Sequence, residues 1–198
     1  MSEHYVGWAD DETHPLSQAN LKTLDTAAKF APQIIAEFVT SDDTLSEVLF
    51  DNIPIGPFHH IEVRFSGRVT GTLANRELQC RLNGDTGNNY ERGSVSLDFA
   101  AGRDDSFFPD TNQAAIGRVS VGRSSTTASI HAAQGLSSFK SIHGLSHVRQ
   151  GGAASTNWVA LVSGRWESTA DITSIAIRTT QTFEPLSMFT LVGYFEVP

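Results

Sequence analysis

The sequence predicts an all-β protein, an antiparallel two-sheet sandwich or jelly roll with a short, partly helical N-terminal leader. From residue 34 onward, apolar and polar residues alternate with a period of two, which is the side-chain period of a β-strand. Clusters of Gly, Asn, Asp, Ser and Pro separate these alternating runs, as turns do. No helical pattern lies between the runs, and this disfavours a parallel α/β sheet.

The clearest strand spans residues 59–69. Ile61, Val63 and Phe65 point to one face, and polar or charged residues occupy the positions between them. Such a strand has one face in the core and the other in solvent. Nine further strand candidates are residues 34–40, 45–51, 77–82, 94–99, 116–121, 138–147, 157–166, 172–180 and 188–197. Ten strands of this kind suit a two-sheet architecture.

The single cysteine, Cys80, lies between Leu78 and Leu82 on the apolar face of strand 77–82. A buried cysteine behaves as a small apolar residue. We therefore expect Cys80 in the core and not as a catalytic thiol. One cysteine also excludes an internal disulfide framework and a multi-cysteine zinc site.

The leader, residues 1–33, has a different pattern from the β-sandwich domain, residues 34–198. Leu21, Leu24 and Ala28 fall at positions i, i+3 and i+7, the spacing of one helical face. A segment this short cannot bury its own apolar side, so it packs on the following domain, docks on another subunit or stays disordered. We expect these residues to anchor the chain to a partner. A frayed chain end is the competing interpretation.

Charge is concentrated at the start of the chain. Residues 1–51 hold ten acidic residues and two lysines, a net charge of −8, and the rest holds twelve charges of each sign. Nucleic-acid binding needs a basic surface and is not expected. No apolar run approaches the roughly 20 residues that span a bilayer, so membrane insertion is not expected either. The first residues also lack the basic-then-apolar pattern of a signal peptide.

No catalytic motif stands out in the sequence. It contains no Gly-x-Ser-x-Gly elbow, no Gly-x-x-x-x-Gly-Lys phosphate loop and no dinucleotide-binding Gly-x-Gly-x-x-Gly after a strand. Asp104, Asp105 and Asp110, in a predicted loop over residues 102–110, are candidates for a glycoside-hydrolysing carboxylate pair, but spacing along the chain does not set their separation. We therefore predict no enzyme activity and no cofactor, with a depolymerase as the least favoured reading.

Metal binding is not predicted. The histidines lack the spacing of a helical metal motif; those considered are His59, His60, His131, His143 and His147. In a strand, His143 and His147 would lie about 13 Å apart at roughly 3.3 Å per residue. The segment Asn83–Tyr90 carries oxygen-bearing side chains that suit Ca²⁺, but turn chemistry explains its Asn-Gly and Thr-Gly pairs equally well, and we expect a turn.

Several motifs occur in an order typical of one group of proteins. Phe50-Asp51-Asn52-Ile53-Pro54 precedes an amphipathic strand, and Asn83-Gly84-Asp85-Thr86-Gly87-Asn88-Asn89-Tyr90 follows as a turn. Ile172-Thr173-Ser174-Ile175-Ala176-Ile177 and Leu191-Val192-Gly193 close the series. With these motifs, residues 45–198 resemble tailed-bacteriophage virion proteins with a lectin-like β-sandwich domain, found in tail fibres, tail tips and capsid-surface appendages. One departure is Val192, where a tyrosine is common; Tyr194 follows two positions later.

The resemblance implies a non-enzymatic structural component of a virion, such as a capsid decoration, neck or tail appendage. Such a protein is assembled in the host cytoplasm, binds other virion proteins through its leader and forms homo-oligomers, with a trimer favoured. The alternative is a carbohydrate-binding receptor module for host-surface glycans. Trp158 and Trp166, which lie eight residues apart on one strand face, and Tyr90 are then the stacking candidates, although large aromatic residues on such strands more often belong to the core.

Overall fold

The computed structural model describes residues 31–54, 58–71, 76–98, 102–131, 138–149 and 157–195. All regular secondary structure in these ranges is β, which confirms the predicted all-β class. No helix in the described ranges is long and apolar enough to cross a membrane. The anchoring candidates Leu21, Leu24 and Ala28 lie outside the described residues, so the predicted leader stays a prediction.

The described residues form twelve strands. They are β1 (Gln33–Val39), β2 (Glu47–Phe50), β3 (Phe58–Gly67), β4 (Arg76–Leu82), β5 (Tyr90–Asp98), β6 (Gly102–Thr111), β7 (Ala114–Val119), β8 (Ser124–His131), β9 (Lys140–Arg149), β10 (Asn157–Trp166), β11 (Ile175–Arg178) and β12 (Met188–Phe195).

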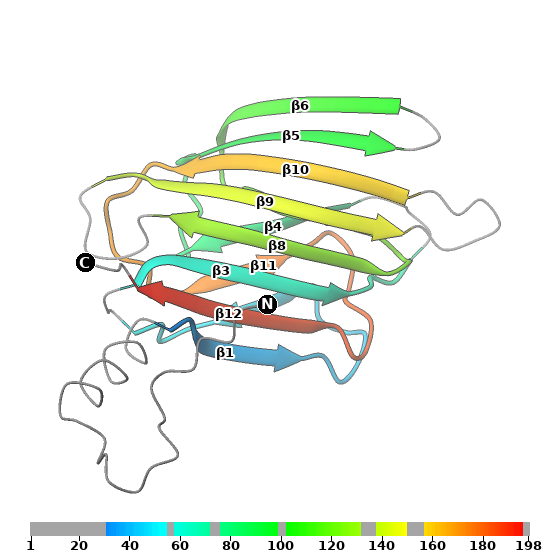
Figure 1. Ribbon diagram of the computed structural model, residues 1–198, viewed down its shortest axis with the longest axis horizontal. Helices are drawn as coiled ribbons and strands as arrows, with labels where there is room; N and C mark the ends of the chain where they lie inside the picture. The colour runs from blue at the N-terminus through cyan, green and yellow to red at the C-terminus, as the bar shows by residue number, and fades with distance from the viewer. Residues whose placement is uncertain are drawn as a thin grey trace, which may run out of the picture.

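The strands form two antiparallel sheets. The large sheet has eight strands in the order β1-β12-β3-β8-β9-β10-β5-β6, and the small sheet has four in the order β2-β11-β4-β7. Figure 1 shows the large sheet in front, from β6 at the top to β1 at the bottom, with the small sheet behind it. This two-layer arrangement agrees with the predicted sandwich.

The core lies between the two sheets, where the alternation places it. Phe65, Phe183 and Phe189 form its aromatic centre, with ring centroids 4.8 to 5.8 Å apart. All ten residues that the strand pattern directs to the interior are buried, namely Ile61, Val63, Phe65, Leu78, Cys80, Leu82, Ile175, Ile177, Leu191 and Gly193. The burial of these residues explains why the strands pair in this register.

The two sheets approach each other most closely where β7 crosses β9. A Cβ atom added to Gly144 would overlap the backbone carbonyl of Ile116 on β7, and one added to Gly117 would overlap Ser146 and Thr126. Glycine is therefore needed on both sides of this contact. There is therefore no room for a larger side chain at Gly144, on the part of β9 that β7 covers.

Two observed strands, β6 and β8, were not predicted from the sequence. The expectation of a loop over residues 102–110 was wrong, because this segment is the edge strand β6. Nearly every side chain of β6 is exposed, so no apolar alternation marks it. In β8, the buried positions Ser124, Thr126 and Ala128 are small or polar, and they hide the alternation in the same way.

Candidate functional site

The outer face of the large sheet, turned away from the small sheet, carries a group of exposed apolar side chains. Strand register brings them together, because Leu161 on β10 lies opposite Val95 on β5 and opposite Leu145 on β9. Leu97 and Phe107 extend the group along β5 and onto β6. These five side chains are 36 to 67% exposed and are called the apolar stripe below.

On β5, one of the strands that carry the stripe, the usual places of large and small residues are reversed. On β5, Ser94 and Ser96 point inward and are buried, whereas Val95 and Leu97 point outward and are exposed. A strand that only served the core would place its apolar residues inward. The Arg118 side chain of β7 donates a hydrogen bond to the Ser94 hydroxyl at 3.1 Å, which gives one of these inner serines a role, but no described contact of this kind explains the exposed Val95 and Leu97.

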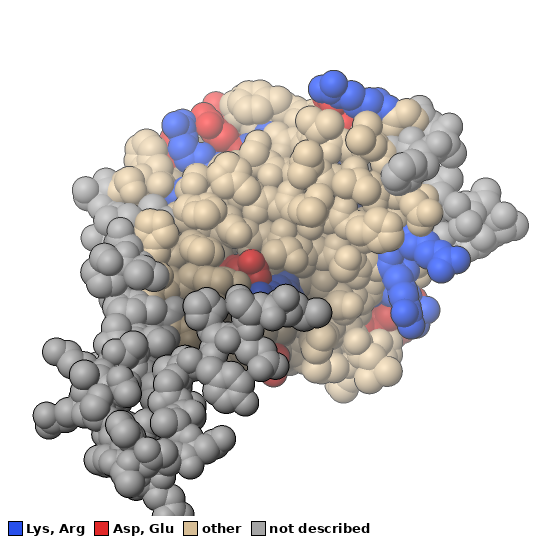
Figure 2. All heavy atoms as spheres, in the orientation of Figure 1, with Lys and Arg blue, Asp and Glu red and all other residues tan. Residues whose placement is uncertain are grey.

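The stripe has few charges and a shallow hollow. A groove of about 370 Å³ over β10, β5 and β6 is lined by Gly93, Ser94, Val95, Asp105, Ser106, Phe107, Leu161, Val162 and Ser163, and among these described residues Asp105 is the one that is charged. In Figure 2, the described charged side chains on this half of the face lie toward its margins. Contiguous exposed apolar surface of this kind marks an interaction site.

The adjoining edge of the sheet is protected against strand addition. On β6, Arg103 forms an ion pair with Asp105 at 2.7 Å, and Asp104 and Asp110 are exposed beside it. Pro109 removes one backbone donor from this edge. Charged residues and proline are the usual means of blocking edge-to-edge pairing. The favoured contact is therefore through the face of the sheet.

A row of rings crosses the other half of the outer face, and we call it the histidine row. Tyr194 stacks on His60 at 4.3 Å, His60 lies 5.1 Å from His131, and His131 lies 5.7 Å from His143, all between ring centroids. Burial and the neighbouring histidines lower the pKa of His60 and of His131. The neutral forms of His60 and His131 are therefore favoured. The described residues contain no group of three or more ligand side chains that could hold a metal ion.

Two of the three predicted glycan platforms are core residues. Tyr90 and Trp166 are 1% and 2% exposed and stack on each other with centroids 6.2 Å apart. The Tyr90 hydroxyl accepts the backbone N–H of Leu82 at 2.9 Å. Rings this buried cannot stack on a sugar, so the prediction is wrong for both. Trp158 is half-buried on the inner-facing side of β10.

The segment Asn83–Tyr90 forms the predicted turn, with its oxygen atoms already engaged. The Asp85 carboxylate accepts hydrogen bonds from Trp166 Nε1 at 2.7 Å, the Gly87 N–H at 2.9 Å and Asn89 Nδ2 at 3.0 Å. Burial acts to raise the pKa of Asp85, but these hydrogen bonds outweigh it and hold the pKa below its ordinary value. The carboxylate therefore pins the turn to the indole of Trp166.

The candidate catalytic groups do not converge. Asp104 and Asp105 are consecutive residues of β6, so their side chains point to opposite faces of the sheet. Asp105 is also engaged by Arg103. Cys80 is fully buried, and burial raises the pKa of its thiol to about 12. None of these groups has the geometry of a carboxylate pair or an activated nucleophile.

Comparisons with protein-family models, with curated proteins and with solved structures gave no match to this chain. The functional argument therefore depends on the surfaces described above. The sequence did not reveal the apolar stripe or the histidine row, because each is assembled from strands far apart in the chain. The available sequence signal for the stripe was that Leu145 and Leu161 occupy outward-facing strand positions next to small residues.

Proposed function

We propose that the chain is a non-enzymatic structural subunit of a tailed-phage virion and that copies of it associate through the apolar stripe. The observation that carries the association is the exposed apolar surface of the outer face. On β5, Ser94 and Ser96 lie inside while Val95 and Leu97 lie outside, and the exposed Leu145 of β9 and Leu161 of β10 continue this surface. The virion assignment is supported by the resemblance of residues 45–198 to phage appendage proteins. Homo-oligomers of such proteins close by rotational symmetry, and a trimer is favoured.

The energetic reason for association is the exposed apolar area. Burying one large aliphatic side chain stabilises a complex by about 1.5–3 kcal/mol before the cost of association is subtracted. The stripe offers five large apolar residues on four neighbouring strands. Its flanks carry Ser163 and the Arg103–Asp105 pair, which suit the polar rim of an interface.

A carbohydrate-binding module remains the alternative. Burial of Tyr90 and Trp166 leaves only Trp158 of the original platforms. The observation in its favour is the histidine row, which places several rings on an open sheet face. Association of copies through the stripe would leave this half of the face accessible, so the two roles are compatible.

The association is tested by placing a charge in the stripe. Leu161 is 58% exposed, so Leu161→Asp should leave the fold intact but reduce the assembled mass to that of a monomer. Leu49→Asp is the matched control, because Leu49 is 59% exposed but lies on β2 of the small sheet, away from the stripe. An assembly unaffected by Leu161→Asp, or equally disrupted by both changes, would contradict the proposal.

The virion assignment needs a separate test. Immunogold labelling of purified phage particles, with antibodies against the full chain, should decorate a defined position on each particle. Purified particles without the protein would overturn the virion assignment while leaving the association through the stripe untouched. The two parts of the proposal can therefore fail independently.

A further inference from the structure

One end of the large sheet holds a pocket that shares no residue with the apolar stripe. β3 and β9 end there, and β8 and β12 begin there, on the right in Figure 1. The pocket has a volume of about 690 Å³. It is lined by Ser66, Gly67, Arg68, Arg123, Ser124, Ser125, His147, Arg149, Pro185, Leu186 and Ser187. Cavities of roughly 300–1,000 Å³ are typical of small-molecule sites.

The pocket is basic in a chain of net charge −8. Arg68 is paired with Glu184 at 2.9 Å, but within the described ranges no carboxylate pairs with Arg123 or Arg149. Both side chains are exposed at the mouth of the pocket. Two guanidinium groups without acidic partners attract an anion, and their planar forks match carboxylate, sulfate or phosphate oxygens.

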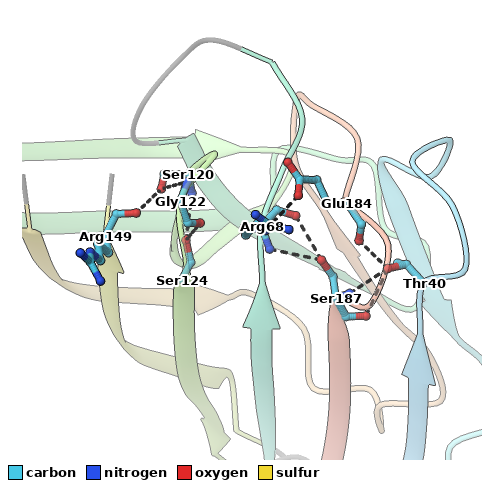
Figure 3. A network of polar contacts seen from close by, with 8 residues as sticks. All are labelled: Thr40, Arg68, Ser120, Gly122, Ser124, Arg149, Glu184 and Ser187. Atoms are coloured by element: carbon cyan, nitrogen blue, oxygen red, sulfur yellow. Dashed lines mark hydrogen bonds and ion pairs between the residues drawn. The ribbon is translucent and has the colours of Figure 1, made fainter. Parts of the chain in front are cut away.

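Buried hydroxyl groups fix the backbone on one side of this pocket (Figure 3). The Ser120 hydroxyl donates to the Arg149 carbonyl at 3.2 Å and accepts the Gly122 N–H at 3.0 Å. The Ser120 N–H donates to the Ser124 hydroxyl at 3.0 Å. The Arg149 N–H donates to the Arg123 carbonyl at 2.7 Å, which ties the two arginine positions together. The backbones of both free arginines are therefore held in place.

A second set of hydrogen bonds fixes the opposite wall (Figure 3). The Ser187 hydroxyl donates to the Arg68 carbonyl at 3.1 Å and accepts the Arg68 N–H at 3.2 Å. The Thr40 hydroxyl donates to the Glu184 carbonyl at 2.6 Å and accepts the Ser187 N–H at 2.9 Å. Pre-organised walls lower the ordering cost of binding a ligand.

The part of the pocket wall formed by Pro185 and Leu186 is apolar, and its backbone is strained at Leu186. Leu186 has a φ of 65° and is 82% exposed, an unfavourable conformation and an unfavourable exposure for leucine. Such strain persists where the surrounding structure enforces it and is concentrated at functional sites. Here the Leu186 N–H donates to the Thr40 carbonyl at 2.9 Å. Leu186 and the adjacent Pro185 give the lining of the pocket an apolar part.

We propose that this pocket binds an acidic saccharide, with Arg123 and Arg149 on its anionic group. Ser66 and Ser125 line the pocket, and a serine hydroxyl is able both to donate and to accept a hydrogen bond, which suits a ligand with several hydroxyl groups. The Pro185–Leu186 surface suits the C–H face of a sugar ring. The cavity is also larger than an inorganic anion requires. This binding goes beyond the assembly role and does not depend on it.

The test is calorimetric titration of the full chain with glucuronic acid, galactose 6-sulfate and glucose 6-phosphate, which distinguish the three anionic groups. We expect at least one to bind and neutral glucose not to bind. The Arg123→Ala/Arg149→Ala double variant should weaken binding about tenfold or more, as expected when charged hydrogen bonds are lost. Arg178→Ala is the matched control, because Arg178 lies on β11 of the small sheet beside Glu47.

Four results would overturn the proposal. If none of the three acidic sugars binds, or if binding is unchanged in the Arg123→Ala/Arg149→Ala variant, the pocket is not the proposed binding site. If neutral glucose binds as tightly as the acidic sugars, the anionic group does not contribute to recognition. If inorganic sulfate binds as tightly as the acidic sugars, the pocket does not recognise the sugar part of the ligand, and the proposal of a saccharide ligand is wrong. Circular dichroism of both arginine variants checks that the fold is retained, and sedimentation of the same samples reports assembly separately.

Discussion

The residues on the two faces of the large sheet have different explanations. On β9, the inner face presents Gly144 and Ser146, whose small size is imposed by the close approach of β7. The outer face of the same strand presents Leu145, which no described element of the fold covers and which is 52% exposed. Packing therefore explains the inner residues, whereas the outer leucine calls for a partner outside the fold. The predictions below test this distinction.

The largest expected difference is in thiol reactivity, between the core and the outer face of the large sheet. Cys80 in the core should react with a thiol reagent only when the chain unfolds, because it is fully buried and its thiol pKa is raised to about 12. A cysteine introduced by Thr127→Cys on the outer face should react at least about 10³-fold faster, given ordinary domain stability. Peptide mass spectrometry after timed labelling measures both rates. Comparable rates would place Cys80 outside the core.

Glycine substitutions compare the same two faces by steric fit. Gly144→Ala should destabilise the fold by about 3 kcal/mol or more, because its Cβ would overlap the Ile116 backbone. Gly93→Ala, on the outer face, meets its nearest atoms at 3.6 Å and should change stability by less than about 1 kcal/mol. Urea unfolding of both variants measures the difference. Similar losses for the two variants would contradict the close approach of β7.

At the end of the inner face, the indole of Trp166 depends on one acceptor. Asp85→Ala should cost about 1–3 kcal/mol, because it leaves the buried Trp166 N–H without the partner it has at 2.7 Å. Asp85→Asn is the control, since its amide oxygen can still accept that hydrogen bond. Thermal or urea unfolding measures both variants. An alanine variant as stable as the asparagine variant would show that the hydrogen bond contributes little.

The smallest expected effect belongs to the histidine row. Burial and then repulsion by neighbouring histidines lower the folded-state pKa of His60 and of His131 below the ordinary 6.5. Protonation therefore favours the unfolded chain, and stability should fall as the pH drops below about 6.5. His59, His143 and Glu62 lie near these rings; the first two oppose protonation there and the carboxylate favours it.

Urea unfolding between pH 7 and pH 5 measures this slope. The His60→Gln/His131→Gln variant should reduce it, and His147→Gln, an exposed histidine of β9, serves as the control. A slope unchanged in the double variant would assign the pH dependence to other groups. The comparison thereby separates the histidine row from the general acid sensitivity of the protein.

The sequence predicted the inner face well and the outer face poorly. Alternation identified Ile61, Val63 and Phe65 as core residues, because burial on one face leaves a period of two. The same rule says nothing about Leu145 or Val95, whose partners come from other strands. Tyr90 and Trp166 were misassigned as glycan platforms, because an aromatic residue next to a turn has no sequence signal that separates core from surface.

The missed strands and the pocket have a related explanation. β6 is an exposed edge and β8 buries serine and threonine, so neither shows apolar alternation. Arg123 and Arg149 are 26 positions apart in the sequence (149 − 123) and meet only because β8 and β9 are neighbours. The spacing of residues along the sequence cannot reveal clusters that form between neighbouring strands. The pocket and the histidine row both belong to this class.

The central claim is that the outer face of the large sheet holds copies of the chain together. Sedimentation equilibrium of the full chain over a hundredfold range of concentration tests it most directly. The account predicts a mass that approaches a multiple of 21.5 kDa at high concentration, with three copies favoured. A mass of 21.5 kDa at every concentration would contradict it.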